Sequence, residues 1–245
     1  NCSDEDELYN RYKKAIEESP KKPLAIIVNY PSNPTTYTVT AKFYERIVAL
    51  CLKHKIYIIS DLAYSEIYFE EAPTSILEIP GAKEITVEFT TVSKTYSMAG
   101  WRVGFAAGCP ELIASIAKVK SFTDYGIFIP IQDAVAYALN NSDADIENNR
   151  KLYRERRDIM VSGLNKLSWN VTAPTAGMFL WCKIPEKFSH LNSMEFSKFL
   201  LDKTNVVVSP GTGFGEEGEG YVRFSLIQDL QKSKQALKNL AKIFN

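Results

Sequence analysis

Short apolar segments alternate with segments of helical periodicity in the first part of the chain. Residues 24–28 and 56–60 are short and almost wholly apolar, a pattern typical of strands that are buried on both faces. Between them, Thr40 precedes a segment whose apolar residues recur at the spacing of one helix face, which predicts a helix capped by the Thr40 hydroxyl. The apolar residues of that face are Phe43, Ile47, Leu50 and Cys51.

The same alternation continues further along the chain. Residues 85–92 are rich in β-branched and aromatic side chains and predict a third strand, and residues 103–107 predict a fourth. Gly108 and Pro110 mark a break before a helix, whose expected inward residues are Leu112, Ile113, Ile116 and Val119. Strands that alternate with helices predict an α/β fold with a mainly parallel sheet.

An acidic cluster lies at the start of the chain. Ser3 and the carboxylates after it match a capping box with acidic residues in the first helical turn. This pattern predicts a helix that runs through Leu8, Tyr12 and Ile16 and ends before Pro20.

The pattern changes after residue 142. A long, charge-rich helix is predicted from about residue 145 to 167. The later segments predict strands and helices in mixed order, with strands at 178–184, 206–208 and 221–226 and helices at 193–201 and 229–244. We therefore expect a larger domain over residues 1–145 and a smaller α+β domain over residues 146–245.

Composition and charge exclude several classes of protein. Lys plus Arg and Asp plus Glu number 29 each, so no charge excess indicates nucleic acid or an anionic membrane as a partner. No apolar run reaches the length of a membrane span, and no signal-peptide pattern is present. The four cysteines have neither disulfide-framework nor metal-site spacing, which indicates free thiols in a reducing compartment and a cytoplasmic location; they are Cys2, Cys51, Cys109 and Cys182.

Three polar side chains follow predicted strands. Asn33, Asp61 and Lys94 each lie at or just past the carboxyl end of one strand, the edge at which open α/β sheets bind ligands. Arg102 follows Lys94 by eight residues. A lysine beside such an arginine suits a Schiff base to an aldehyde cofactor that carries a phosphate, because the guanidinium can bind phosphate oxygens in pairs.

Four ordered motifs carry a family resemblance. They are Asn29-Tyr-Pro-Ser-Asn-Pro-Thr35, Asp61-Leu-Ala-Tyr64, Thr91-Val-Ser-Lys-Thr-Tyr-Ser-Met-Ala-Gly-Trp-Arg-Val-Gly104 and Tyr221-Val-Arg-Phe-Ser225. Together they resemble the class I/II aminotransferases, which use pyridoxal 5'-phosphate (PLP). The resemblance implies PLP-dependent transferase fold type I and extends from about residue 20 to the end. It also implies that the chain is the C-terminal portion of such a protein, with part of the large domain and the whole small domain.

The resemblance implies roles for residues around the cofactor ring. Lys94 corresponds to the lysine that forms the internal aldimine with PLP and then moves a proton to and from the substrate Cα. Asp61 would pair with the pyridinium nitrogen, although an Asp after a strand is also a common helix cap. Tyr64 and Asn33 would donate hydrogen bonds to the phenolate oxygen. The Asn33–Pro34 peptide is expected to be cis, as in relatives.

The resemblance also implies two sets of residues that bind anions. Arg102 would bind the cofactor phosphate with the hydroxyls of Thr91 and Ser93. Arg223, together with Asn33, would bind the substrate, with the Arg223 guanidinium on the α-carboxylate. The alternative for Arg223 is a surface position on an edge strand.

A glycine cluster is a second candidate for phosphate binding. Gly211, Gly213 and Gly215 lie close together, but the cluster is not placed between a strand and a helix. A lone glycine cluster without that context is weak evidence, and we do not interpret this one as a phosphate loop.

The motifs most resemble those of bacterial glutamate–pyruvate (alanine) aminotransferases. This predicts amino-group transfer between alanine or glutamate and pyruvate or 2-oxoglutarate, in a homodimer. Alternatives are an aspartate or diaminopimelate-type aminotransferase, or a PLP-dependent C–S β-lyase with the same Lys94, Asp61 and Arg223. A non-catalytic PLP-sensing domain of a transcription regulator is a further alternative. We expect the isolated chain to be inactive or barely active.

Overall fold

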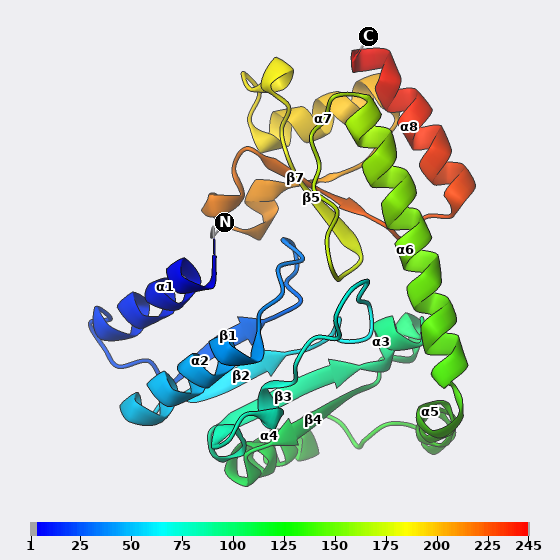
Figure 1. The fold of residues 1–245 in the computed structure, drawn as a ribbon. Coiled ribbons are helices and arrows are strands. Elements are labelled where there is room, and N and C mark those ends of the chain that lie inside the picture. The colour runs from blue at the N-terminus through cyan, green and yellow to red at the C-terminus, as the bar shows by residue number, and fades with distance from the viewer. Residues whose placement is uncertain (1–3, 245) are drawn as a thin grey trace. The chain divides into compact units, whose positions relative to one another are not determined.

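The computed structural model describes residues 4–244, which divide into two compact units (Figure 1). The larger unit comprises residues 4–31 and Thr38–Asn149, and the smaller unit comprises Ser32–Tyr37 and residues 150–244. The chain passes from one unit to the other within the long helix α6, Asp143–Lys166. Each unit has a sheet of its own.

The sheet of the larger unit has four strands in the order in which they occur along the chain. They are β1 Ala25–Asn29, β2 Tyr57–Asp61, β3 Thr86–Thr91 and β4 Gly104–Gly108. The first three are parallel, and β4 pairs antiparallel with β3. The predicted α/β fold with a mainly parallel sheet is thus confirmed. Gly108 ends β4 at a φ of +132°, where a Cβ would lie 2.1 Å from the Thr86 carbonyl oxygen, so a side chain is excluded there.

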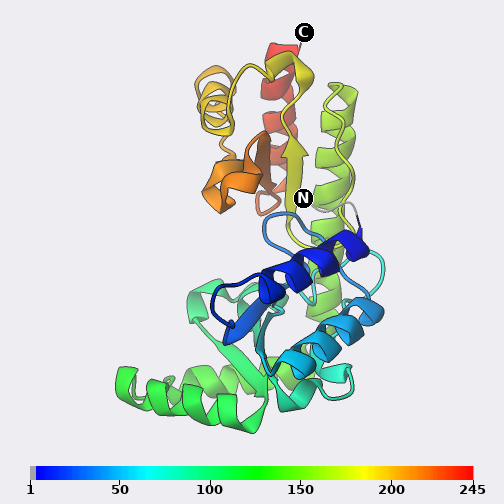
Figure 2. The same cartoon turned by 90° about the vertical axis from the view of Figure 1, so that its left-hand side faces the viewer.

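Helices belong to the same unit, and α2 connects β1 to β2. They are α1 Glu5–Glu17, α2 Ala41–His54, α3 Val92–Thr95, α4 Pro110–Thr123 and α5 Ile129–Asn141, and the short 3₁₀ turns are Ile76–Glu78, Ala82–Glu84 and Ala99–Trp101. The predicted cap of α2 is confirmed, because the Thr40 hydroxyl accepts a hydrogen bond from the Phe43 amide. The cap of α1 is Asp4, whose carboxylate accepts from the Glu7 amide at 2.8 Å; Ser3 lies outside the described residues. Figure 2 shows α1 and α2 side by side.

Burial at the edges of this unit differs from the sequence prediction. The first strand was predicted to be buried on both faces, but Leu24 is 79% exposed and Ile27 is 65% exposed. These side chains are exposed because β1 lies at the edge of the sheet. Val119 of α4 was predicted to point inward and is 64% exposed. Helix α5 was not predicted at all.

The smaller unit contains an antiparallel sheet of three strands. These are β5 Phe179–Lys183, β6 Ser209–Pro210 and β7 Tyr221–Ser225, in the order β5-β7-β6. The helices are α7 Ser193–Thr204, α8 Leu230–Phe244 and the part of α6 after Asn149, with 3₁₀ turns at Glu186–Phe188, Gly211–Phe214 and Glu216–Gly218. The strand predicted at 206–208 was misplaced: Val206 and Val208 are buried, but pairing begins only at Ser209.

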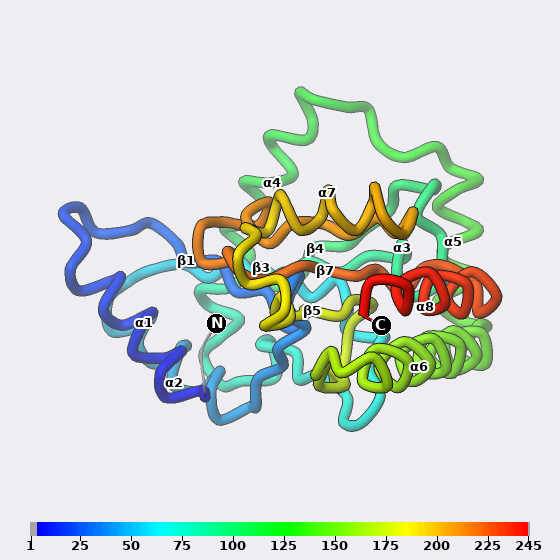
Figure 3. Tube along the Cα trace, turned by 90° about the horizontal axis from the view of Figure 1, so that it is seen from above, coloured from blue at the N-terminus to red at the C-terminus, as the bar shows by residue number. Residues whose placement is uncertain are grey.

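A tryptophan lies at the centre of the smaller unit. Trp169 is almost fully buried, and its indole donates a hydrogen bond of 2.7 Å to the Lys183 carbonyl oxygen. Its ring contacts the rings of Phe196, Phe224 and Phe244, which come from α7, β7 and α8. Helices α6 and α8 lie side by side in this unit (Figure 3). The core around Trp169 therefore contains side chains from α7, β7 and α8.

No helix within residues 4–244 is long and apolar enough to cross a membrane.

Candidate active site

Lys94 lies in a single helical turn that begins where β3 ends. The Thr91 side chain caps this turn, since its Oγ1 accepts a hydrogen bond of 3.1 Å from the Ser93 amide. The same hydroxyl donates to the Val103 carbonyl oxygen at 2.8 Å, which ties the start of α3 to the chain just before β4. The local sequence thus fixes the backbone of Lys94 between two paired strands.

Asn149 holds the other end of the lysine turn. Its side-chain amide donates hydrogen bonds to the carbonyl oxygens of Lys94, at 3.1 Å, and Thr95, at 3.2 Å. Its amide oxygen accepts from the Ser97 hydroxyl at 3.2 Å. Carbonyl groups at a helix end need partners from outside the helix, and Asn149 supplies them. Asn149 could not be predicted from the sequence, because no motif includes it and it lies far along the chain from Lys94.

Tyr64 and Asp61 lie on the segment that follows β2. Tyr64 is buried, and the Lys94 Nζ lies 6.0 Å from the centroid of its ring, so these two candidate residues are brought together. Asp61 is the last residue of β2, and its Oδ1 accepts a hydrogen bond of 3.2 Å from the Ala63 amide. The capping contact weighed for Asp61 is therefore present. The residue is nevertheless exposed, so its carboxylate also remains open to a ligand.

The three residues expected to bind phosphate lie at one corner of the larger unit. Thr91 Oγ1 is 3.0 Å from Ser93 Oγ. Arg102 immediately precedes Val103, whose carbonyl oxygen accepts from Thr91. Arg102 has a left-handed backbone, with φ of 57°, and its guanidinium donates to the Ala99 carbonyl oxygen at 2.8 Å. Two hydroxyls and an exposed guanidinium thus lie beside the lysine turn.

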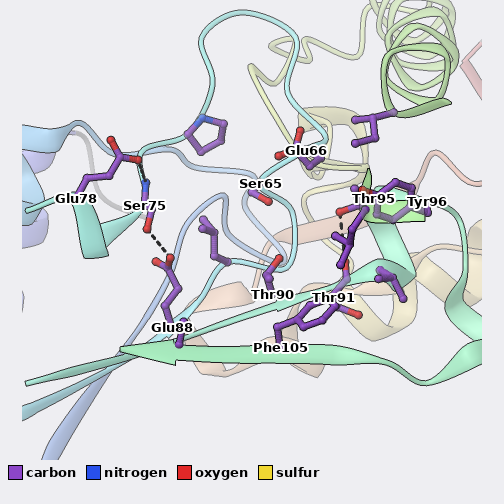
Figure 4. Close-up of a pocket in the computed structure, with 16 residues that line it drawn as sticks. Ser65, Glu66, Ser75, Glu78, Glu88, Thr90, Thr91, Thr95, Tyr96 and Phe105 are labelled. Atoms are coloured by element: carbon purple, nitrogen blue, oxygen red, sulfur yellow. Dashed lines mark hydrogen bonds between the residues drawn. The ribbon is translucent and has the colours of Figure 1, made fainter. Parts of the chain in front are cut away.

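A cavity of about 400 Å³, lined in part by Thr91, lies in the larger unit (Figure 4). Among the candidate residues, all of which the structure describes, only Thr91 lines it. The cavity contains the buried carboxylate of Glu88, which accepts from Ser60 Oγ at 3.0 Å, Ser75 Oγ at 2.5 Å and the Ile76 amide at 3.2 Å. Glu88 therefore links β2 and β3 to the turn that begins at Ile76, and it supports the strand that ends at Asp61 and the strand that precedes the lysine turn. Glu88 was not among the residues predicted from the sequence.

Arg223 and Asn33 are brought together in the smaller unit. The Arg223 Nη1 donates a hydrogen bond of 2.6 Å to Asn33 Oδ1, and Nη2 lies 3.4 Å from the Ser209 hydroxyl. The guanidinium carbon lies 4.1 Å from the centroid of the Phe179 ring and 4.5 Å from that of Phe214. The edge-strand alternative for Arg223 is wrong, because β7 is the central strand of its sheet.

The segment that carries Asn33 has an unusual backbone. The Asn33–Pro34 peptide is cis, as expected, and so is the Tyr30–Pro31 peptide. The Ser32 amide donates to the Tyr37 carbonyl oxygen at 2.9 Å, and the Thr36 amide donates to the Ser32 carbonyl oxygen at 2.8 Å. These bonds close the segment on itself and fix the direction of the Asn33 side chain toward Arg223.

The candidate residues therefore form two groups. Six of the seven residues expected around the cofactor lie in the larger unit, and they are Asp61, Tyr64, Thr91, Ser93, Lys94 and Arg102. The seventh, Asn33, lies with Arg223 in the smaller unit. A carboxylate, a phenol, an amine, two hydroxyls and a guanidinium match the pyridine nitrogen, ring oxygen, aldehyde and phosphate of PLP. The residues present in the larger unit thus fit that cofactor.

The sequence model of the family described as aminotransferase class I and II matches residues 3–240. The chain belongs to this family. It is 51% identical over 234 residues to a Rhizobium meliloti protein named AatC, covering 95% of this chain and 58% of the relative. It is 41% identical over 240 residues to the glutamate-pyruvate aminotransferase AlaC of Escherichia coli, covering 97% of this chain and 58% of the relative. It is 44% identical over 220 residues to an LL-diaminopimelate aminotransferase of Nitratidesulfovibrio vulgaris, covering 89% of this chain and 56% of the relative.

Solved structures give the same result for the fold. The aromatic aminotransferase from Pyrococcus horikoshii matches with a TM-score of 0.89 at 31% identity, covering 99% of this chain and 63% of that one. The fold is that of fold type I PLP-dependent transferases, and the cofactor of these aminotransferases is PLP. The chain spans 58% of the length of AatC and of AlaC.

Proposed function

We propose that the protein transfers an amino group between an L-amino acid and a 2-oxo acid, with PLP bound covalently to Lys94. The observation that carries this proposal is the position of Lys94, in a capped turn between β3 and β4, beside Tyr64 and the hydroxyls of Thr91 and Ser93. The membership of the chain in the aminotransferase family supports it.

The residues of the larger unit have distinct tasks in this proposal. When bound, PLP supplies an electron sink for the electrons released at the substrate Cα. The Lys94 amine attaches the cofactor and then takes the proton from the substrate Cα. The Asp61 carboxylate balances a positive charge on the pyridine nitrogen. Tyr64 donates a hydrogen bond to the ring oxygen, while Arg102, Thr91 and Ser93 hold the phosphate.

Arg223 binds the substrate α-carboxylate in this proposal. A guanidinium presents paired N–H groups whose spacing matches a carboxylate, and Asn33 holds one side of that group through its bond to Nη1. This interaction is common to all α-amino acids and does not select among their side chains. Specificity for one amino acid must come from other groups.

Alanine or glutamate, with pyruvate or 2-oxoglutarate, is the substrate pair we propose. The likeness to AlaC over 97% of the chain supports it. The diaminopimelate aminotransferases are similar to a comparable degree, so a diaminopimelate-type or aspartate substrate is the alternative. A C–S β-lyase would use the same lysine, aspartate and arginine. We also propose that the protein is cytoplasmic and homodimeric, and that the boundary between its two domains along the chain lies near residue 145.

Attachment of the cofactor to one particular lysine tests the proposal. The purified chain is incubated with PLP, reduced with borohydride and digested, and the peptides are analysed by mass spectrometry. We expect the phosphopyridoxyl group on the peptide that contains Lys94. Lys118→Ala, at an exposed position on α4, should leave this mark unchanged, and Lys94→Ala should remove it. Labelling spread over many lysines in all three proteins would contradict the proposal.

Product analysis distinguishes the two reaction classes. With L-alanine and 2-oxoglutarate, an aminotransferase yields pyruvate and glutamate without free ammonia. A β-lyase acting on a cysteine S-conjugate yields pyruvate, ammonia and a thiol. The measurement is made on PLP-loaded protein that has not been treated with borohydride, from a preparation whose reduced sample carries the mark on Lys94.

A further inference from the structure

One face of the small sheet carries a row of aromatic side chains around Arg223. In the antiparallel pair of β5 and β7, Trp181 lies opposite Arg223, and Lys183 lies opposite Tyr221. Because side chains alternate between the two faces of a sheet, Phe179, Trp181, Tyr221 and Arg223 lie on the same face. Trp181 and Tyr221 stack, with ring centroids 5.3 Å apart and an interplanar angle of 3°.

Phe214 reaches this face from a different part of the chain. It ends the 3₁₀ turn Gly211–Phe214, and its ring meets the Trp181 ring edge-on at 5.9 Å. The Arg223 guanidinium carbon lies 4.5 Å from its centroid, close to the 4.1 Å separation from Phe179. Arg223 is therefore in contact with two rings, one from its own sheet and one from this turn.

The backbone of the segment that carries Phe214 is closed by two glycines. We call residues 211–218 the glycine loop. A Cβ on Gly211 would lie 1.8 Å from the Gly218 carbonyl oxygen and 2.7 Å from the Tyr221 carbonyl oxygen, and a Cβ on Gly218 would lie 2.1 Å from the Gly211 carbonyl oxygen. These are contacts with backbone, which has little freedom to move aside. The two ends of the loop can touch only because neither residue has a side chain.

The charge of the glycine loop does not suit an anion. Glu216 and Glu217 lie in it and are exposed. Like charges would repel a phosphate at this place. The loop therefore needs another explanation for its glycines.

We propose that the glycine loop places Phe214 against Arg223, and that Phe214 is a positioning residue for the carboxylate-binding guanidinium. The proposal rests on the assignment of Arg223 to the substrate carboxylate. An aromatic ring against a guanidinium attracts its charge and limits its rotation. Phe179, Phe214 and the bond to Asn33 together orient the group before substrate arrives, so less conformational freedom is lost on binding.

The test uses propionate as a probe, because it has a carboxylate and no amine to react. The Nε–Hε signal of Arg223 is assigned in an NMR spectrum of the ¹⁵N-labelled chain by its loss in Arg223→Lys, and propionate is then titrated. Four further variants are compared with the unsubstituted chain. Phe214→Leu removes the ring, Phe214→Tyr keeps it, Gly211→Ala forces the loop ends apart, and Gly213→Ala adds a methyl group where no atom lies within 4 Å.

We expect propionate to shift the Arg223 signal of the unsubstituted chain in a saturable way. Phe214→Leu and Gly211→Ala should weaken propionate binding by about threefold to tenfold, the range expected for one cation–π contact. Both should also change the position of the Arg223 signal before any propionate is added, because the ring beside the guanidinium is removed in Phe214→Leu and displaced in Gly211→Ala. Phe214→Tyr and Gly213→Ala should match the unsubstituted chain on both readouts.

Two results would overturn the proposal, and they are distinguishable. Unchanged propionate affinity and an unchanged Arg223 signal in Phe214→Leu would overturn the positioning role alone. No shift of Arg223 with propionate in the unsubstituted chain would remove the carboxylate role of Arg223, and the positioning role with it. If Gly211→Ala fails to fold by circular dichroism, Phe214→Leu and Phe214→Tyr still decide the question.

Discussion

Glu219 connects the start of α7 to the sheet of the smaller unit. Its Oε1 accepts hydrogen bonds from the amides of Ser193, at 2.8 Å, and Gly220, at 2.7 Å, and its Oε2 accepts from the Ser193 hydroxyl at 3.2 Å. The Ser193 hydroxyl also lies 3.0 Å from that of Thr212 in the glycine loop. Desolvation raises the pKa of Glu219, but these hydrogen bonds lower it and prevail.

The lowered pKa of Glu219 predicts a pH-dependent stability. The carboxylate stabilises the folded chain above its unfolded pKa of 4.5, and this contribution is lost as the pH falls through the lower pKa of the folded state. Glu219→Gln should therefore lower the melting temperature at neutral pH, and the difference should shrink below about pH 4.5. The control is Glu217→Gln, at an exposed position in the glycine loop. The prediction would be contradicted if the difference in melting temperature between Glu219→Gln and the unsubstituted chain stayed constant from pH 7 to pH 3.

At the scale of elements, Gly163 is the contact point between α6 and α8. A Cβ at Gly163 would lie 2.3 Å and 2.5 Å from the two methyl groups of Leu237. Replacement of glycine by alanine inside a helix ordinarily stabilises by about 1 kcal/mol. Here we expect Gly163→Ala to lack this gain in the free energy of unfolding, because the half-buried Leu237 side chain must turn away from the new methyl group.

Urea denaturation measures this effect. Ser162→Ala, at the adjacent exposed position, is the control and should change little. Leu237→Ala should relieve the overlap, so the double variant should be less destabilised than the sum of the two single variants. Additive effects would mean that the two residues do not share a contact.

Local chemistry explains which elements were predictable. The cap of α2, the strand that ends before Lys94 and the helix that ends the chain depend on residues close in sequence. The exposure of Leu24 and Ile27 depends on strand order instead, which periodicity does not encode. The strand expected at 206–208 was misplaced because buried valines resemble a strand whether or not they pair.

The candidate site follows the same rule. The motif residues were identified from sequence alone because each motif is short and ordered. The groups that hold them were not, because Asn149 contacts Lys94, and Phe214 contacts Arg223, only after the chain has folded. Side chains that support a site from distant parts of the sequence leave no local pattern.

At the scale of the whole molecule, each of the two units has a buried core of its own. Ile58 in the larger unit and Leu200 in the smaller unit are both fully buried. Units with separate cores often unfold in separate steps. We expect the two cores to respond separately to substitution.

Tryptophan fluorescence can follow the smaller unit alone. In a Trp101→Phe background, the remaining tryptophans are Trp169 and Trp181, which both belong to that unit. Leu200→Ala should lower the free energy of unfolding seen by fluorescence by about 2–5 kcal/mol, as cavities in a core do. Ile58→Ala should leave the fluorescence transition in place and shift only the circular dichroism transition of the larger unit. Equal shifts of both signals in both variants would mean that the two units unfold together in one cooperative transition.

The antiparallel pairing of β3 with β4 has a consequence for how the larger unit folds. Only residues 92–103 separate these two strands, whereas residues 30–56 separate β1 from β2 and residues 62–85 separate β2 from β3. Closing a short loop costs the least chain entropy, so this pair is the least costly nucleus of the sheet. The loop it closes contains both Lys94 and Arg102. The segment that would bind the cofactor is therefore expected to take its shape early, before the parallel strands have joined the sheet.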